Sequence, residues 1–125
     1  MKDYICHSGG CPGADMMWEN ESSKYGIKTI AYSFYNHIQE SNNRKILSIE
    51  ELKEGYEATK IANKSLKTNI NDVIYPYIRN LISRNWFQVK NSDAIFAIGT
   101  FADAEHVVVN GGTGWAVQMA VDNRK

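Results

Sequence analysis

The 125-residue sequence has few cysteines and no excess of charge, and each shortage excludes a class of site or partner. Its two cysteines, Cys6 and Cys11, have no second Cys or His pair with which to complete a zinc site, and disulfides are rare in the cytosol. Fourteen basic residues balance fourteen acidic ones. The sequence has no dense basic cluster that could bind along the phosphates of a nucleic-acid duplex. We therefore expect no metal site, no cofactor and no duplex partner.

Membrane and secretion signals are also missing. No apolar stretch approaches the roughly 20 residues that a membrane-spanning helix needs. The first residues lack the apolar core of a signal peptide. The composition, 43% apolar and 22% charged, is that of an ordinary globular protein. The sequence thus predicts one domain over residues 1–125 of a cytoplasmic protein, with no membrane partner.

What the sequence does have is a glycine-rich stretch near each end. Residues 8–15 read Ser-Gly-Gly-Cys-Pro-Gly-Ala-Asp and separate a predicted strand over residues 4–7 from a predicted helix over residues 15–25, which Gly26 ends. Glycines let a backbone approach a ligand closely, and the first N–H groups of a helix are unpaired. The stretch is therefore either an anion-binding site or a tight connection that binds nothing. A second such turn contains Gly111, Gly112, Thr113 and Gly114.

The rest of the chain alternates strand and helix patterns, which predicts an α/β fold with a mostly parallel sheet flanked by helices. A short apolar run typical of a buried parallel strand covers residues 93–99. The predicted strands are residues 4–7, 27–34, 93–99 and 106–109, and the predicted helices are residues 15–25, 48–67, 76–90 and 115–122. A doubly wound sheet would add one more strand, so either the chain is truncated or another subunit completes a small sheet.

Aromatic side chains and a histidine lie near the end of the second predicted strand. Tyr32, Phe34 and His37 would occupy the carboxyl edge of a parallel sheet, where ligands bind. An aromatic ring there either stacks on a base or fills the core. The residues that follow, 35–43, have no clear period and are predicted to form a loop.

Together these motifs resemble the SLOG superfamily. Ser-Gly-Gly-x-x-Gly-Ala-Asp, Arg84 nine residues before Asp93, and Gly-Gly-Thr-Gly-Trp-Ala-Val at residues 111–117 occur in one order over nearly the whole chain. The superfamily joins the LOG-type nucleotide phosphoribohydrolases to nucleotide-sensing domains, including those of bacterial antiviral systems. The resemblance is strongest to uncharacterised phage and bacterial proteins. It implies a single Rossmann-like domain that binds a nucleotide derivative.

The same resemblance argues against catalysis. LOG enzymes cleave an N-glycosidic bond with a helix Arg and a Glu that follows the late glycine motif. Arg84 matches the Arg, but Gln118 replaces the Glu and Trp115 replaces a Thr. An amide cannot take a proton or stabilise an oxocarbenium-like centre by charge, so the substitution implies binding without hydrolysis. A displaced acid would have to come from Asp15, Glu19 or Glu105.

The resemblance implies a ligand site that draws on both glycine stretches and the residues near them. A phage protein that sequesters an ADP-ribose-like or cyclic signal in an infected bacterium fits this picture, and the rivals are an N-glycosidase and a nucleotide-sensing subunit. SLOG relatives commonly pair, and with Trp86 and Phe87 expected to be exposed we predict a homo-oligomer. The expected ligand-binding residues are Ser8, Gly9, Gly10, Gly13, Ala14, Asp15, Tyr32, Phe34, His37, Arg84, Gln88, Gly111, Gly112, Thr113, Gly114, Trp115 and Gln118.

Overall fold

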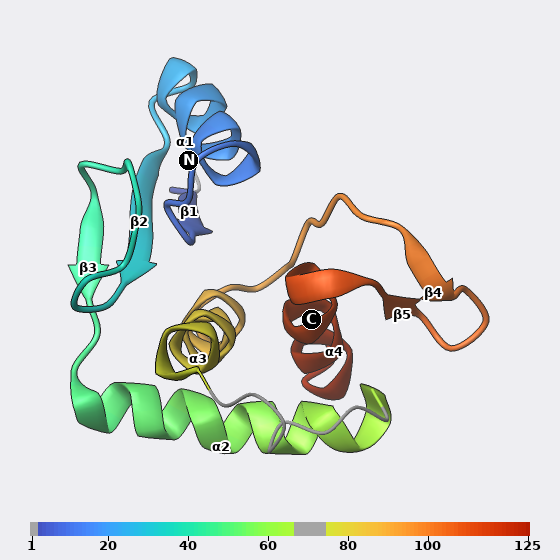
Figure 1. Cartoon of the computed structure of the whole chain (residues 1–125). Helices are drawn as coiled ribbons and strands as arrows, with labels where there is room; N and C mark the ends of the chain where they lie inside the picture. The colour runs from blue at the N-terminus through green and yellow to red at the C-terminus, as the bar shows by residue number, and fades with distance from the viewer. Residues whose placement is uncertain (1–2, 67–74) are drawn as a thin grey trace. The chain divides into compact units, whose positions relative to one another are not determined.

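The chain is a mixed α/β protein. A computed structural model describes residues 3–66 and 75–125, which divide into two compact units, residues 1–48 and residues 49–125. The prediction of a single domain over residues 1–125 stays a prediction, and we describe each unit by itself. Along the chain the elements are β1 (Ile5–Ser8), α1 (Ala14–Lys24), β2 (Lys28–Ser33), β3 (Arg44–Ile46), α2 (Ile49–Leu66), α3 (Pro76–Lys90), β4 (Phe101–Asp103), β5 (Val108–Val109) and α4 (Gly111–Asp122) (Figure 1).

The first unit contains a three-stranded parallel sheet with β2 in the middle. In the β1–β2 pair Ser8 lies opposite Ala31, and in the β2–β3 pair Ala31 lies opposite Arg44. Helix α1 packs against β1 and β2, as the blue part of Figure 1 shows. The predicted strand–helix–strand unit with parallel strands is therefore confirmed.

Helix α1 ends where the sequence predicts. Gly26 has a φ of 69°, and its N–H donates to Ser23 O while the N–H of Ile27 donates to Ser22 O. These two bonds form a Schellman motif, which satisfies carbonyls of the last turn and needs a residue that adopts positive φ without strain. The glycine thus turns the chain from α1 into β2.

Strand β3 has no counterpart among the predicted elements. Its three residues are all exposed, so no alternation of polar and apolar residues marks it. Backbone bonds from Ala31 N to Asn43 O and from Leu47 N to Ser33 O join its ends to β2. Main-chain pairing, rather than side-chain burial, therefore defines this strand.

The second unit is built on three helices that pack against one another, with α3 and α4 both lying against α2 (Figure 1). The core centres on Ala62, Val89, Met119 and Ala120. Its α2 face consists of small residues, because Gly55, Thr59 and Ala62 are the buried positions of that helix. The ammonium of Lys125 donates to the carbonyls of Val89, Lys90 and Ser92, which places a cation at the C-terminus of α3.

One strand prediction in this unit is wrong, and another is confirmed only in part. Residues 93–99 form no strand, and Phe96 and Ile98 are each 78% exposed. A buried parallel strand needs hydrogen-bonding neighbours, and the described strands of this unit, β4 and β5, pair with each other. That pairing is antiparallel, and of residues 106–109, predicted as a further strand, Val108 and Val109 form the second strand of a short hairpin. The predicted helix end at residue 67 lies outside the described residues.

The predicted exposure of the α3 aromatics holds only in part. Phe87 is buried, which corrects that prediction, whereas Trp86 is half-buried. Across residues 3–66 and 75–125, none of the helices combines the length and apolar character needed to cross a bilayer.

Candidate functional site

The loop between β1 and α1 turns tightly against the sheet. Ser8, Gly9 and Gly10 are buried, and the Gly10 N–H donates to the Ser8 hydroxyl. Gly10 has a φ of 71°, and a β-carbon on it would lie 3.2 Å from the β-carbon of Ala31. Both the turn and the close approach to β2 therefore require glycine at this position.

The second half of the loop faces outward and leads into α1. Gly13, the N-cap residue, has a φ of 94° and places no side chain on the first N–H groups of the helix. Ala14, the first residue of the helix, is exposed. A helix N-terminus without a side-chain cap is a favourable place for an anion, because its N–H groups have no acceptor within the helix. The N–H groups at the start of α1 can therefore donate hydrogen bonds to a phosphate oxygen.

The carboxylate of Asp15 already accepts a hydrogen bond from one N–H group of this loop. Its Oδ2 accepts a hydrogen bond of 3.1 Å from the backbone N–H of Cys11. An incoming anion therefore has to use the donors that follow Gly13 and to tolerate a carboxylate in the same turn. Asp15 itself lies in the first turn of α1.

A thiol and an imidazole meet beside this loop. Cys11 Sγ lies 3.4 Å from His37 Nε2, and His37 Nδ1 lies 2.9 Å from the hydroxyl oxygen of Ser33. Cys11 is half-buried, whereas His37 and Ser33 are buried. Of these three residues, only His37 is among the ligand-binding residues predicted from the sequence, since Cys11 and His37 are 26 residues apart and no spacing rule links them.

The two predicted aromatic contacts are packed inside the first unit. Tyr32 and Phe34 are each 2% exposed. The Tyr32 hydroxyl lies 2.9 Å from His7 Nδ1, and the Phe34 ring stacks on His37 with centroids 4.7 Å apart. Their predicted contact with a base or ribose stays a prediction.

The second glycine stretch is the first turn of α4 rather than a loop before it, which corrects the predicted helix start at residue 115. Gly111 begins the helix with a φ of 73°. A β-carbon on Gly114 would lie 2.0 Å from Val109 O, so only glycine lets the helix approach β5 so closely. Gly112 and Thr113 are exposed, and the N-cap residue Asn110 makes no side-chain cap.

Polar residues of α3 connect to this turn. The side-chain amide of Asn85 donates to Gly112 O at 3.3 Å, and the Gln88 amide lies 3.5 Å from Asn85 Oδ1. Arg84, the residue before Asn85, is buried on the same helix. The structure thus brings Gln88 and the second glycine stretch into one network.

Gln118 points its amide along its own helix. The Gln118 Nε2 donates to Asp122 Oδ1 at 2.8 Å, and Gln118 is buried. Trp115 packs against the core of the second unit. The predicted ligand contacts of both residues stay predictions.

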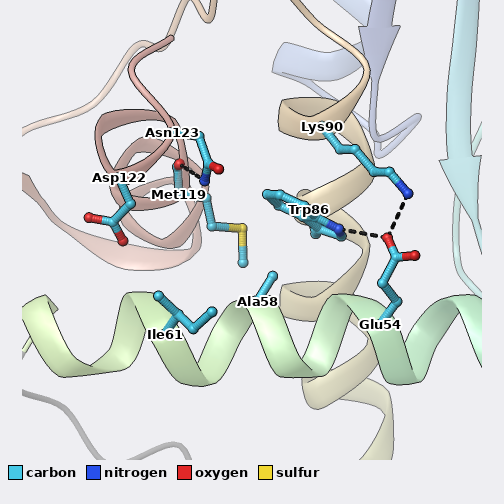
Figure 2. A pocket seen from close by; sticks show the side chains of 8 residues that line it. All are labelled: Glu54, Ala58, Ile61, Trp86, Lys90, Met119, Asp122 and Asn123. Carbon is cyan, nitrogen blue, oxygen red and sulfur yellow. Dashed lines mark hydrogen bonds and ion pairs between the residues drawn. The ribbon is translucent and has the colours of Figure 1, made fainter.

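A cavity of about 400 Å³ lies among α2, α3 and α4 (Figure 2). Hydrogen bonds from the Lys90 ammonium at 2.9 Å and from the Trp86 indole at 2.8 Å hold the pKa of the Glu54 carboxyl below its usual value. None of the predicted ligand residues lines this cavity, and no motif or spacing in the sequence indicates it. Its lining residues are Glu54, Ala58, Ile61, Trp86, Lys90, Met119, Asp122 and Asn123.

The predicted site residues belong to different units. Those up to His37 lie in the first unit, and those from Arg84 onward lie in the second. Their joint contact with one ligand stays a prediction. Within the described ranges, no group of three or more His, Cys, Asp or Glu side chains is arranged to hold a metal ion.

No protein-family model, no curated protein and no solved structure matches this chain.

Proposed function

We propose that the loop between β1 and α1 binds a phosphate group of a nucleotide-derived ligand, in a Rossmann-like domain of the SLOG type. One observation carries the proposal: a glycine turn at the carboxyl end of a parallel strand leads into a helix whose N-cap, Gly13, has no side chain. Ligands of parallel α/β proteins bind at this edge of the sheet. The exposed Gly13 and Ala14 leave room for a phosphate.

The second glycine turn supports phosphate binding independently. Helix α4 also begins without a side-chain cap, and exposed Gly112 and Thr113 lie in its first turn. The Thr113 side chain adds a hydroxyl to the N–H groups of this turn. The second unit therefore offers a second element suited to a phosphate.

The chain holds its ligand without cleaving it. Gln118, at the position of the LOG glutamate, is an amide already bonded to Asp122. An amide neither accepts a proton nor supplies negative charge to an oxocarbenium-like centre. Capture of a signalling nucleotide, such as an ADP-ribose-like or cyclic product of antiviral immunity, is the role that this combination favours.

A thermal-shift screen tests the proposal. The ligands are AMP, ADP-ribose, NAD, cyclic ADP-ribose isomers and cyclic dinucleotides, and each one that stabilises the protein is recovered and analysed by chromatography. A ligand at about a hundred times its dissociation constant adds roughly 2.7 kcal/mol of stability. Recovery of an intact ligand supports capture, whereas recovery of cleaved products shows an enzyme and overturns the assignment from Gln118.

Two glycines at opposite ends of α1 provide the matched variants. Gly13 and Gly26 both have positive φ, and a β-carbon on either would meet nothing within 4 Å. Gly13→Ala and Gly26→Ala should therefore both lower the melting temperature. Only Gly13→Ala should also weaken the ligand, by about tenfold or 1.4 kcal/mol. Equal affinities in the two variants would reject the loop as the phosphate site.

A further inference from the structure

Cys11 and His37 form a pair suited to thiol chemistry, outside the phosphate-binding role of the loop. The 3.4 Å between Sγ and Nε2 is within hydrogen-bond reach for sulfur. Cys11 as a residue is half-buried, while the His37 beside it is buried. A thiolate, rather than a thiol, is the nucleophile, and an adjacent imidazole that takes the proton generates it.

Ser33 and Phe34 fix the imidazole. The Ser33 hydroxyl oxygen lies 2.9 Å from Nδ1, and the Phe34 ring stacks on the imidazole at an interplanar angle of 23°. When Nδ1–H donates to Ser33, Nε2 carries the lone pair and accepts the proton of the thiol. Ser33 is therefore a positioning residue, because its hydroxyl holds the imidazole beside Cys11 and can accept the Nδ1 proton when Nε2 takes the thiol proton.

We propose that Cys11 is a reactive thiol that forms a mixed disulfide with small disulfides. The Cys11 proton passes to His37 Nε2, and the thiolate attacks one sulfur of R–S–S–R. A new bond forms between Cys11 and that sulfur as the old S–S bond breaks. The departing RS⁻ takes the proton from the imidazolium, so one thiol and one disulfide yield one mixed disulfide and one thiol.

The same geometry argues against acyl transfer. Enzymes with a nucleophilic residue commonly use its backbone N–H to stabilise the oxyanion. Here the Cys11 N–H is bonded to the Asp15 carboxylate, which also places negative charge where an oxyanion would develop. Disulfide exchange needs only the thiolate and a proton carrier, both of which are in place.

Cys6 supplies an internal control for reactivity. Cys6 is also half-buried, but it lies in β1. Within the described residues, no hydrogen bond joins its thiol to a histidine. With iodoacetamide near pH 7, Cys11 should be alkylated about tenfold faster than Cys6, because the imidazole of His37 can take the proton of Cys11 and so supply the reactive thiolate. Peptide mapping by mass spectrometry measures both sites in one sample, and equal rates would overturn the proposal.

Variants then test the imidazole. His37→Gln should reduce the Cys11 rate to that of Cys6, and Ser33→Ala should lower it less while leaving the Cys6 rate unchanged. The rate at Cys11 should stay high to lower pH than the rate at Cys6, although the Asp15 carboxylate from α1 opposes the effect of His37. Circular dichroism establishes that each variant is folded. If His37→Gln does not fold, Ser33→Ala and the two pH profiles decide the question.

Oxidised glutathione tests the reaction itself. Incubation should add one glutathionyl group to Cys11 and none to Cys6, and a reducing thiol should remove it. Addition at both cysteines, or at Cys6 alone, would contradict the proposal. The experiment contains no nucleotide, so its result is independent of whether the loop binds phosphate.

Discussion

The carbonyl oxygen of Ser83 on α3 lies only 2.2 Å from the place where a β-carbon on Gly55 of α2 would be. Only a glycine lets the two helix backbones approach so closely, and Gly55 is accordingly buried. Gly55→Ala should destabilise the protein by about 1–3 kcal/mol, because the helices must separate to admit the methyl group. Urea unfolding monitored by circular dichroism measures the change.

Gly112 is the matched control for that substitution. It also lies in a helix, but a β-carbon on it would meet nothing within 4 Å. Alanine is favoured over glycine in a helix by roughly 1 kcal/mol, so Gly112→Ala should be neutral or stabilising. Destabilisation of both variants to the same extent would show that contact with Ser83 is not the cause.

The Glu54 carboxylate at the cavity edge should make stability depend on pH. Because hydrogen bonds from Lys90 and Trp86 lower its pKa in the folded state, its contribution is present above its ordinary pKa of 4.5 and is lost as the pH falls through the lower folded value. The carboxylate is half exposed, so Glu54→Gln should cost only about 0.5–1 kcal/mol at pH 7.

The free energy of unfolding of wild type should exceed that of Glu54→Gln at pH 7. This difference should be smaller at pH 3. Glu57→Gln is the control, since Glu57 on the same helix forms an exposed ion pair with Lys60. It should change stability by less than about 0.5 kcal/mol at either pH. If wild type and Glu54→Gln differ in unfolding free energy by the same amount at pH 3 as at pH 7, the carboxylate is not the source of the difference.

Glu19 holds the first unit together from the buried side of α1. It is 6% exposed, and its Oε1 accepts hydrogen bonds from the Ser41 hydroxyl and the Asn43 amide. Glu19→Ala leaves both donors without this acceptor and should cost about 1–3 kcal/mol, whereas Glu19→Gln keeps the oxygen and should cost less. On the same helix, Glu21 pairs with Lys24 in solvent, so Glu21→Ala should cost less than about 0.5 kcal/mol. Chemical denaturation of the three variants checks the order.

Local signals predicted the parts of the fold that local interactions determine. Gly26 as a helix stop and Pro76 as a helix start each act within a few residues, and both are confirmed. The prediction of a buried strand over residues 93–99 was wrong for the opposite reason. Burial of a strand depends on neighbours that the run itself does not encode, and an apolar sequence alone does not supply them.

The candidate sites divide in the same way. The glycine turn after β1 was predictable, because the residues that need positive φ are adjacent to the strand and helix that they join. The contact between Cys11 and His37 arises only when β2 lies beside β1 and brings the loop after it toward the glycine turn. Parallel pairing of this kind joins residues far apart in sequence, so spacing within a motif does not reveal it.

Among the residues that the structure describes, Val107, in the turn between β4 and β5, is the β-branched residue with a positive φ. Its φ is 57°, a conformation that β-branched residues rarely adopt, whereas Asn36 has a φ of 60° with a side chain that tolerates it. Val107→Asn should therefore stabilise the protein by about 0.5–1 kcal/mol, and Asn36→Val should destabilise it by about 1 kcal/mol or more. Melting temperatures of the two variants measure both effects. Because Val107 is partly exposed, removing its side chain gives up little burial. Changes of the same sign at both positions would mean that positive φ is not what determines stability there.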